Sequence, residues 1–264
     1  MTAFRDRYGR VAMVTGASSG IGMAFAEALA ARGMDVIAVA RRVDRLEALA
    51  GRLRDAHGVA VTPLAIDLGQ PDAARAIHDC CAGHDVGLVV SNAGFGFKGA
   101  HEDAPPALLA EMLTVNCTVP SLLAQGFIPR LKARAADGRG AGLVMTASVE
   151  GLIGCPYSAA YSASKAMVVA LGEALWGELA PAGIDVLTLC PGPTESEAAA
   201  RQGVDMAAVA QRPAIDVARE TLDRLDQGPT FVSDAKYQAM FDAMRAMPRR
   251  EALTAMAAGM KPKR

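Results

Sequence analysis

Aromatic side chains and an excess of either charge are both scarce in this sequence. Phe, Trp and Tyr make up 5% of the 264 residues, and the formal net charge at pH 7 is −1. A protein that binds nucleic acid electrostatically needs a broad basic surface that contacts phosphates. The sequence therefore predicts no nucleic-acid partner, and we interpret the basic run KPKR at positions 261–264 as a solvated tail.

Cysteine and histidine are few and are not spaced as metal ligands. The cysteines lack the pattern of a zinc site, and an odd number of them in a chain of this length argues against a disulfide framework. The histidines fall on expected loops and helix ends. We expect reduced thiols, a cytoplasmic location and no metal. The residues concerned are Cys80, Cys81, Cys117, Cys155, Cys190, His57, His78, His84 and His101.

Long hydrophobic runs are also few. The N-terminal stretch MTAFRDRYGR has no apolar core of the kind found in signal peptides. The longest apolar stretch that we identify, AMVVALGEALW, is too short to cross a bilayer and contains Glu173. We therefore expect neither export nor a membrane span.

What the chain does contain is an alternation of short apolar runs with longer alanine-rich segments. Strands that alternate with helices form a parallel sheet, and nearly continuous apolar strands are covered on both faces. The predicted fold is α/β, a doubly wound parallel sheet (Rossmann fold) with helices on both faces, in one domain spanning residues 1–264. The predicted strands lie at 11–16, 35–40, 59–66, 86–94, 142–148 and 184–192.

Two segments stand apart from this pattern. We expect residues 194–212 to form a substrate lid and residues 234–264 to form a helical tail. In the tail, Met240, Met244 and Met247 have the spacing of one helix face. This stripe favours packing against the core or another subunit, although methionines also suit an adaptable lid.

The stretch VTGASSGIG follows the first predicted strand and opens a helix. Its glycines, Gly16, Gly20 and Gly22, allow backbone N–H groups to approach a pyrophosphate, whose charge the helix dipole favours. The glycine spacing differs from the common G-x-G-x-x-G fingerprint. A tight turn is the plainer reading, but three glycines together with Ser18 and Ser19 favour a nucleotide site.

The end of the second predicted strand, about 20 residues beyond the glycines, distinguishes the two nicotinamide cofactors. Arg41 and Arg42 stand there, and guanidinium groups suit a 2′-phosphate by charge and by geometry. The pair predicts NADP(H), unless both arginines merely solvate a helix start. Asp67, after the third strand, is suited equally to bonding adenine's amino group and to capping the helix that follows.

Tyr161 and Lys165 in YSASK lie one turn apart on the same face of a predicted helix. A nearby ammonium favours the phenolate and lowers the pKa of the phenol, which makes the phenol more useful as an acid or base. Pairs of this spacing are usually exposed, so the pair alone is weak evidence. Ser148, at the end of the fifth strand, adds a hydroxyl that could hold a carbonyl oxygen, or could serve only as a turn or cap residue.

Taken together, residues from about Gly9 to Val232 resemble the short-chain dehydrogenase/reductase family. TGASSGIG looks like the cofactor motif of that family, YSASK matches its Y-x-x-x-K motif, and SNAG resembles its N-N-A-G motif with Ser91 in place of the first Asn. The resemblance implies that Asn116, Ser148, Tyr161 and Lys165 form the catalytic tetrad.

The resemblance also implies the cofactor site. Asn92 would brace the central strands, and the loop Pro191–Thr194 would meet the nicotinamide carboxamide. The cofactor-binding residues expected from the motifs and the resemblance are Gly16, Ser18, Ser19, Gly20, Ile21, Gly22, Arg41, Arg42, Asp67, Leu68, Asn92, Ala93, Gly94, Tyr161, Lys165, Pro191, Gly192 and Thr194.

The function expected from the resemblance is NADP(H)-dependent hydride transfer between the nicotinamide and a carbonyl or secondary alcohol. The segments near the site offer Phe95, Phe97, Leu152, Ile153 and Met206, which favour a lipophilic ketone, aldehyde or acyl substrate unless they are ordinary core packing. A non-catalytic NADP(H)-binding redox sensor is the main alternative, and a module for another anion is weaker.

The resemblance further implies a homodimer or homotetramer, with the long helix that includes KAMVVALGEALWGEL as a contact surface. The tail departs from the family members that end in a V-D-G-G-type strand, which leaves the tetrameric arrangement open.

Overall fold

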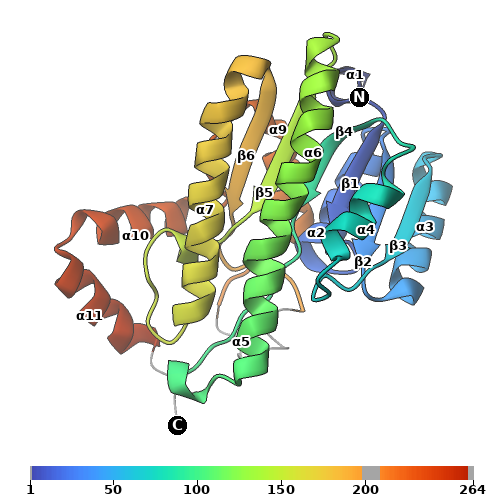
Figure 1. The fold of residues 1–264 in the computed structure, drawn as a ribbon. Coiled ribbons are helices and arrows are strands. Elements are labelled where there is room, and N and C mark those ends of the chain that lie inside the picture. The colour runs from blue at the N-terminus through green and yellow to red at the C-terminus, as the bar shows by residue number, and fades with distance from the viewer. Residues whose placement is uncertain (1, 198–208, 261–264) are drawn as a thin grey trace.

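The computed structural model describes residues 2–197 and 209–260 (Figure 1). Within these residues, seven parallel strands form one sheet in the order β3-β2-β1-β4-β5-β6-β7. All six strands expected from the sequence are present, and a short seventh strand follows near the C-terminal tail. The strands are β1 (Val11–Thr15), β2 (Asp35–Ala40), β3 (Val61–Ala65), β4 (Val86–Ser91), β5 (Ala141–Thr146), β6 (Ile184–Cys190) and β7 (Thr230–Val232).

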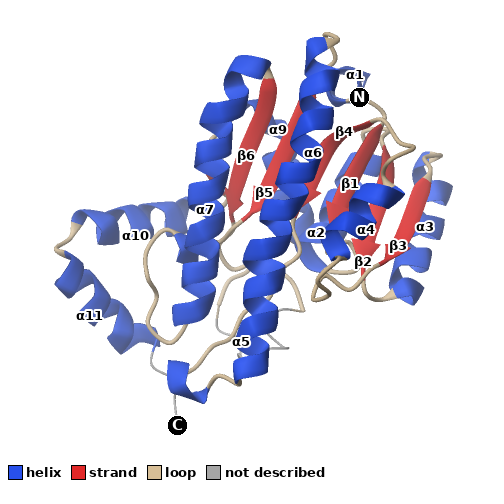
Figure 2. Ribbon diagram, in the orientation of Figure 1, coloured by secondary structure: helices blue, strands red, loops and turns tan. Residues whose placement is uncertain are grey.

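Helices cover both faces of the sheet, as Figures 1 and 2 show. One hydrophobic cluster joins the strands to α2 (Gly20–Ala30), α3 (Val43–His57) and α9 (Ala214–Asp223). A second cluster joins the opposite face to α4 (Ala73–Cys80), α6 (Val119–Ala136) and α7 (Ala159–Leu179). This arrangement confirms the predicted doubly wound α/β fold. The remaining helices at the start and between these elements are α1 (Thr2–Tyr8), η1 (His101–Asp103), α5 (Pro106–Leu113), η2 (Thr114–Thr118), η3 (Val149–Gly151), η4 (Ala180–Ala182) and η5 (Leu225–Gln227).

The alternation of side chains along a strand explains why the strands are apolar throughout. In β1, Ala12 and Val14 pack into one cluster, whereas Val11 and Met13 pack into the other. A strand with helices on both sides therefore has no polar face. β3, at the edge of the sheet, tolerates Pro63 because an edge strand can spare a backbone N–H.

The strand order reverses between β1 and β4, which lie side by side at the middle of the sheet. In open parallel sheets of this kind, ligands bind beyond the carboxyl ends of the strands at this reversal point. The glycine turn follows β1, and the SNAG motif follows β4. Both motifs therefore lie where the fold places a ligand.

The tail forms two helices, α10 (Ala235–Ala246) and α11 (Arg249–Met260). Buried Phe241 and Met256 pack with Ile153 on the loop that follows β5, so Ile153 is a core residue rather than a pocket wall. In the methionine stripe, only Met244 packs against this cluster, while Met240 and Met247 are exposed. The described part of the tail is thus helical over most of its length to residue 260, and packing accounts for one of the three methionines.

The survey of apolar stretches from the sequence missed one segment. α5, η2 and α6 run on as a helix from Pro106 to Ala136, 31 residues with a mean hydropathy of 1.5 over its most apolar window, which is long and apolar enough to cross a membrane. Core helices of soluble proteins meet the same criterion, so the finding is weak evidence for a span. Leu123, Phe127 and Leu131 of this helix are fully buried against the sheet.

Candidate active site

The glycine turn between β1 and α2 brings backbone atoms into close contact. Gly16 and Gly20 have positive φ angles of 73° and 54°, which favour glycine. A Cβ atom at Gly22 would lie 2.3 Å from the carbonyl oxygen of Gly16, so only glycine fits at that position. The turn leaves the N-terminus of α2, where backbone N–H groups favour an anion, close to the end of β1.

Arg42 folds back onto this turn. Its guanidinium donates to the hydroxyl of Ser18 at 2.9 Å and to that of Ser19 at 3.0 Å, and it pairs with Glu197 at 2.9 Å. Arg42 therefore does more than solvate the start of α3. Arg45, which the sequence analysis did not select, binds the other oxygen of Glu197.

Arg41 takes a different direction from Arg42. It is more than half exposed, pairs with Glu111 at 3.3 Å and lies 4.0 Å from Asp67. Asp67 accepts the backbone N–H of Gly69 at 3.1 Å, while α4 begins only at Ala73. The carboxylate thus shapes the turn after β3, and the suggestion that Asp67 caps the next helix is wrong. Leu68 beside it is buried in the core.

The segment after β4 ties the middle of the sheet to the helices. The backbone N–H groups of Asn92 and Ala93 donate to the hydroxyl of Thr15 at 2.9 and 3.0 Å, and the side chain of Asn92 donates to the carbonyl of Thr15 at 3.1 Å. Asn92 therefore braces β1 against β4. A Cβ at Gly94 would lie 2.9 Å from the amine of Lys165 and 3.0 Å from the amide oxygen of Asn116, so glycine allows both side chains to approach this strand end.

Asn116 lies on the π-helical turn η2, a type of local widening that is frequent at functional sites. Its amide is fully buried and exchanges hydrogen bonds with the backbone of Phe95, donating at 2.8 Å and accepting at 3.1 Å. It also donates to the hydroxyl of Ser164 at 3.0 Å. These bonds fix Asn116 against α7 and against the loop after β4.

Tyr161, Ser148 and Lys165 meet at the N-terminal part of α7. The hydroxyl of Ser148 lies near enough to the phenol of Tyr161 to favour its ionised form, and it accepts the backbone N–H of Glu150 at 3.2 Å. The ring of Tyr161 lies against the backbone of Gly96, and the amine of Lys165 is 5.9 Å from the ring centroid. Lys165 is almost fully buried and donates to the carbonyl of Thr146 at 2.9 Å. The four residues of the expected tetrad thus lie close together, beyond the carboxyl ends of the central strands.

The electrostatics of this cluster differ from the sequence-based expectation. Burial, and then the charge of Glu150, raise the pKa of Tyr161, while the hydroxyl of Ser148 acts in the opposite direction. Burial also lowers the pKa of Lys165 to about 8. The net direction for Tyr161 is therefore opposite to the lowering expected from Lys165, because burial has the largest effect on the phenol.

A second charged group near Tyr161, the pair of Lys98 and Glu150, was missed by sequence reasoning. Lys98 binds the carboxylate of Glu150 at 2.5 Å and the hydroxyl of Ser158 at 3.0 Å, and its amine lies 5.5 Å from the ring centroid of Tyr161. Ser158 donates to Glu150 at 2.6 Å. The available signal in the sequence is one charged residue in each of the otherwise apolar segments FGFKG and EGLIGCPYS.

The turn after β6 carries Pro191, Gly192 and Thr194. A parallel bridge between Thr194 and Arg212 closes the base of the segment expected to form a lid, of which residues 198–208, including Met206, lie outside the described part of the chain. Gly192 lies against Tyr237 of α10. This turn therefore lies between the sheet and the C-terminal helices.

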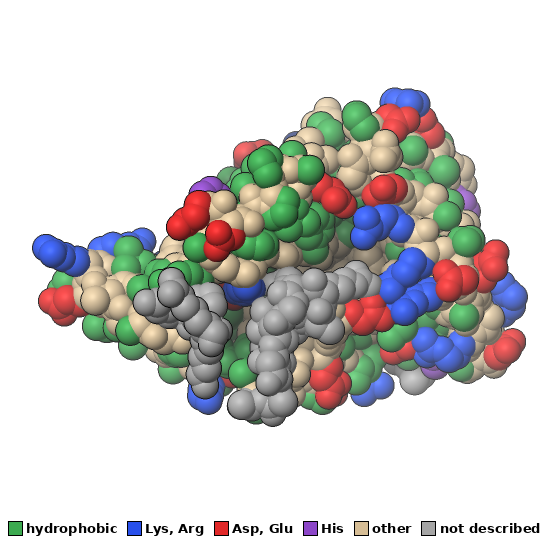
Figure 3. Space-filling view, turned by 90° about the horizontal axis from the view of Figure 1, so that it is seen from below, with side chains coloured by type: hydrophobic (Ala, Val, Ile, Leu, Met, Phe, Trp, Pro, Cys, Tyr) green, Lys and Arg blue, Asp and Glu red, His purple; other side chains and the backbone are tan. Residues whose placement is uncertain are grey.

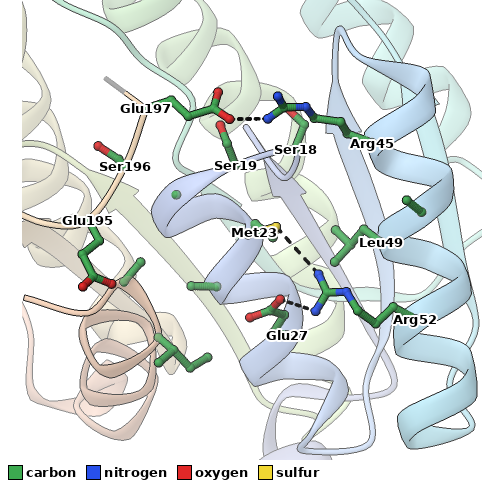
Figure 4. A pocket seen from close by; sticks show the side chains of 15 residues that line it. Ser18, Ser19, Met23, Glu27, Arg45, Leu49, Arg52, Glu195, Ser196 and Glu197 are labelled. Carbon is green, nitrogen blue, oxygen red and sulfur yellow. Dashed lines mark hydrogen bonds and ion pairs between the residues drawn. The ribbon is translucent and has the colours of Figure 1, made fainter. Parts of the chain in front are cut away.

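Two surface features surround these groups. Seen from the carboxyl ends of the strands, hydrophobic side chains gather beside a group of mixed basic and acidic side chains (Figure 3). A cavity of about 540 Å³ opens between α2, α3 and residues 195–197. Ser19, Arg45 and Glu197 point into this cavity, and Arg52 pairs with Glu27 on its wall at 2.6 Å (Figure 4).

Comparison with known proteins agrees with this architecture. The model of the short chain dehydrogenase family matches residues 10–207. A 7beta-hydroxysteroid dehydrogenase of Collinsella aerofaciens is 32% identical over 190 residues, which cover 72% of this chain and 71% of that protein. A 7beta-hydroxysteroid dehydrogenase of Clostridium sardiniense is 35% identical over 191 residues, which cover 72% of each.

A solved structure of a short-chain dehydrogenase from Sphingobium yanoikuyae in complex with NADPH has a TM-score of 0.81 at 31% identity, covering 93% of this chain and 95% of that chain. The fold and these matches define an oxidoreductase that acts on CH–OH or C=O groups. Since the family model spans well over half of its length, the chain belongs to the short-chain dehydrogenase/reductase family.

Proposed function

We propose that this protein transfers hydride between NADP(H) and a carbonyl or secondary alcohol of a bulky lipophilic molecule. The observation that carries the proposal is the convergence of Tyr161, Ser148, Asn116 and buried Lys165 at the carboxyl ends of the strands, where the fold places a ligand. Asn116 completes the group through its contact with the loop after β4.

The residues present fit a phosphorylated dinucleotide. The glycine turn and the N-terminus of α2 suit the pyrophosphate, since any Cβ at Gly22 would fill the space that the backbone needs. Arg42, with Ser18 and Ser19 beside it, supplies the donors that a 2′-phosphate requires. The relative from Sphingobium yanoikuyae, solved with NADPH, supports the same choice of cofactor. When bound, NADP(H) supplies or accepts the hydride.

The protein's own groups would manage the proton and the charge. Ser148 and Tyr161 would donate hydrogen bonds to the carbonyl oxygen, on which negative charge develops during reduction. Because the pKa of Tyr161 is raised, the phenol is protonated at neutral pH and can act as the acid. Lys165, with its pKa lowered to about 8, would exchange protons through water near Asn116.

The substrate proposal rests on the walls of the site and on the relatives. Phe95 and Leu152 are partly buried beside the site, and their side chains are apolar. Two relatives of similar length are steroid dehydrogenases. We accordingly favour a polycyclic or similarly bulky ketone, with fatty-acyl carbonyl compounds as the next class.

A direct test follows NADPH oxidation with steroid, acyl, aromatic and short aliphatic carbonyl compounds, with NADH in parallel. We expect turnover with a bulky ketone, preference for NADPH, and loss of most of kcat in Tyr161→Phe. Tyr157→Phe removes a hydroxyl from the preceding loop and should keep kcat. If Tyr161→Phe binds NADPH and retains most of its rate, the assignment of Tyr161 as the acid is wrong.

We also propose a homodimer or homotetramer in the cytoplasm. Leu122 on α6 and Met167 on α7 are large apolar side chains exposed on the two long helices. The five cysteines are all free, which fits a reducing compartment. Light scattering coupled to gel filtration measures the molar mass, and a monomer at all concentrations would contradict the assembly.

A further inference from the structure

Arg42 and Arg45, the arginine pair beside the glycine turn, already bind a carboxylate from the same chain, that of Glu197. Glu197 places one carboxylate oxygen 2.9 Å from the guanidinium of Arg42, and its other oxygen contacts Arg45. The remaining N–H groups of Arg42 point to Ser18 and Ser19. One of the dashed lines in Figure 4 marks the contact between Glu197 and Arg45, which both line the cavity.

A carboxylate and a phosphate monoester use the same donors. Both offer two or more oxygens to a guanidinium fork, and the phosphate carries the greater charge. We propose that the carboxylate of Glu197 competes with the 2′-phosphate of NADP(H) for Arg42 and Arg45. When the cofactor binds, the 2′-phosphate replaces the carboxylate on these two arginines. This inference rests on the proposed NADP(H) site at Arg42.

The chain around Glu197 explains why the carboxylate reaches this position. The bridge between Thr194 and Arg212, with the N–H of Glu195 donating to the carbonyl of Arg212 at 3.0 Å, fixes the chain two residues before Glu197. Arg212 is held in turn by an ion pair with Glu220. The backbone that carries Glu197 is thus anchored two residues earlier, at Glu195.

Room for a phosphate exists beside the ion pair. The cavity of about 540 Å³ is bounded by Ser19, Arg45 and Glu197, so the carboxylate can leave the arginines without displacing a strand or helix. Glu197 follows the turn Pro191–Thr194, which is expected to meet the nicotinamide. One short stretch of chain therefore links the two ends of the proposed cofactor site, and the 2′-phosphate would change the contacts of that stretch.

The competition is expected to be modest in size. The side chains of Glu197 and Arg45 are 39% and 45% exposed, so water and salt screen their attraction. Removing the charge of Glu197 should tighten binding of a 2′-phosphate about two- to tenfold, with less effect at high salt. A ligand without that phosphate should bind unchanged.

The test uses 2′,5′-ADP and 5′-AMP, measured by titration calorimetry on the full chain, so the readout does not depend on catalysis. Glu197→Gln is compared with Glu195→Gln, which removes the same charge from the same cavity wall without touching the arginine pair. Arg42→Met tests the underlying site, because the preference for 2′,5′-ADP over 5′-AMP should disappear in that variant.

The outcomes distinguish competition by Glu197 from the 2′-phosphate site at Arg42 on which that competition rests. Tighter binding of 2′,5′-ADP to Glu197→Gln alone, with 5′-AMP unaffected, supports competition by Glu197. Unchanged or weaker binding, while Arg42→Met still abolishes the preference, overturns the inference and leaves the cofactor site intact. If Arg42→Met keeps the preference, the proposed 2′-phosphate site is itself wrong and the inference fails with it.

Discussion

Replacing Lys98 by Met should move the pH dependence of the reaction upward. The amine of Lys98 neutralises Glu150 and lies 5.5 Å from the ring of Tyr161. Without this cation, the charge of Glu150 is no longer balanced, and Glu150 already raises the pKa of Tyr161. The phenolate of Tyr161, which serves as the base in alcohol oxidation, becomes harder to form.

The size of the shift follows from the separation of the charges. With the 5.5 Å from the Lys98 amine to the ring centroid taken as the scale of the separation, two unit charges interact by about 0.8 kcal/mol in surroundings like water and about 3 kcal/mol at an effective dielectric constant of about 20. Since one pKa unit corresponds to about 1.4 kcal/mol, we expect an upward shift of about 0.5 to 2 pH units. The side chain of Lys98 is 25% exposed, which places the shift within that range rather than beyond it.

The assay is the pH profile of kcat for alcohol oxidation with NADP⁺. Glu150→Gln should shift the profile downward, and the double variant should return close to the wild-type profile because both charges are removed. Lys98→Arg keeps the charge and serves as the matched control. An unshifted profile in Lys98→Met would refute the coupling between this ion pair and Tyr161.

Three further predictions concern stability and nucleotide binding. Because the pKa of Lys165 is lowered to about 8 in the folded state, the unfolded chain binds more protons between pH 8 and 10, so the free energy of unfolding should rise with pH there. Urea titrations should show less of this rise in Lys165→Met, and an identical slope would contradict it. Gly22→Ala should abolish nucleotide binding, measured by calorimetry, because its Cβ would meet Gly16 at 2.3 Å, and wild-type affinity would show that the turn adapts. Phe241→Ala should cost about 3–5 kcal/mol of local stability, seen as faster hydrogen exchange in α10 and α11, whereas unchanged exchange would mean that Phe241 does not hold the tail.

Local patterns sufficed for the sheet and for much of the candidate site. Apolar runs marked the strands because a strand buried on both faces has a simple composition. The spacing of Tyr161 and Lys165 marked one helix face, and Gly94 and Asn116 were selected through the resemblance. The structure places Gly94 against both Lys165 and Asn116, although the separation of these residues along the chain gives no direct sign of it.

The sequence was less informative where the outcome depends on several elements at once. The ion pairs of Glu197 with Arg42 and Arg45 join segments about 150 residues apart, and no local pattern predicts such a pairing. The direction of the pKa shift of Tyr161 was missed for a similar reason. It depends on the burial produced by the surrounding loops and on Glu150, whereas the spacing of Tyr161 and Lys165 describes only one neighbour.

The C-terminal helices α10 and α11 pack against the loop after β5. Phe241 and Met256 share a hydrophobic cluster with Val149 and Ile153 of that loop. This loop begins beside Ser148 and carries Glu150, but the two helices add no strand to the sheet and no residue to the glycine turn. The helices also touch the turn after β6, because Gly192 lies against Tyr237 of α10. Exchange of the chain after β7 would therefore alter the support of the Ser148 loop and of the turn expected to meet the nicotinamide at the same time.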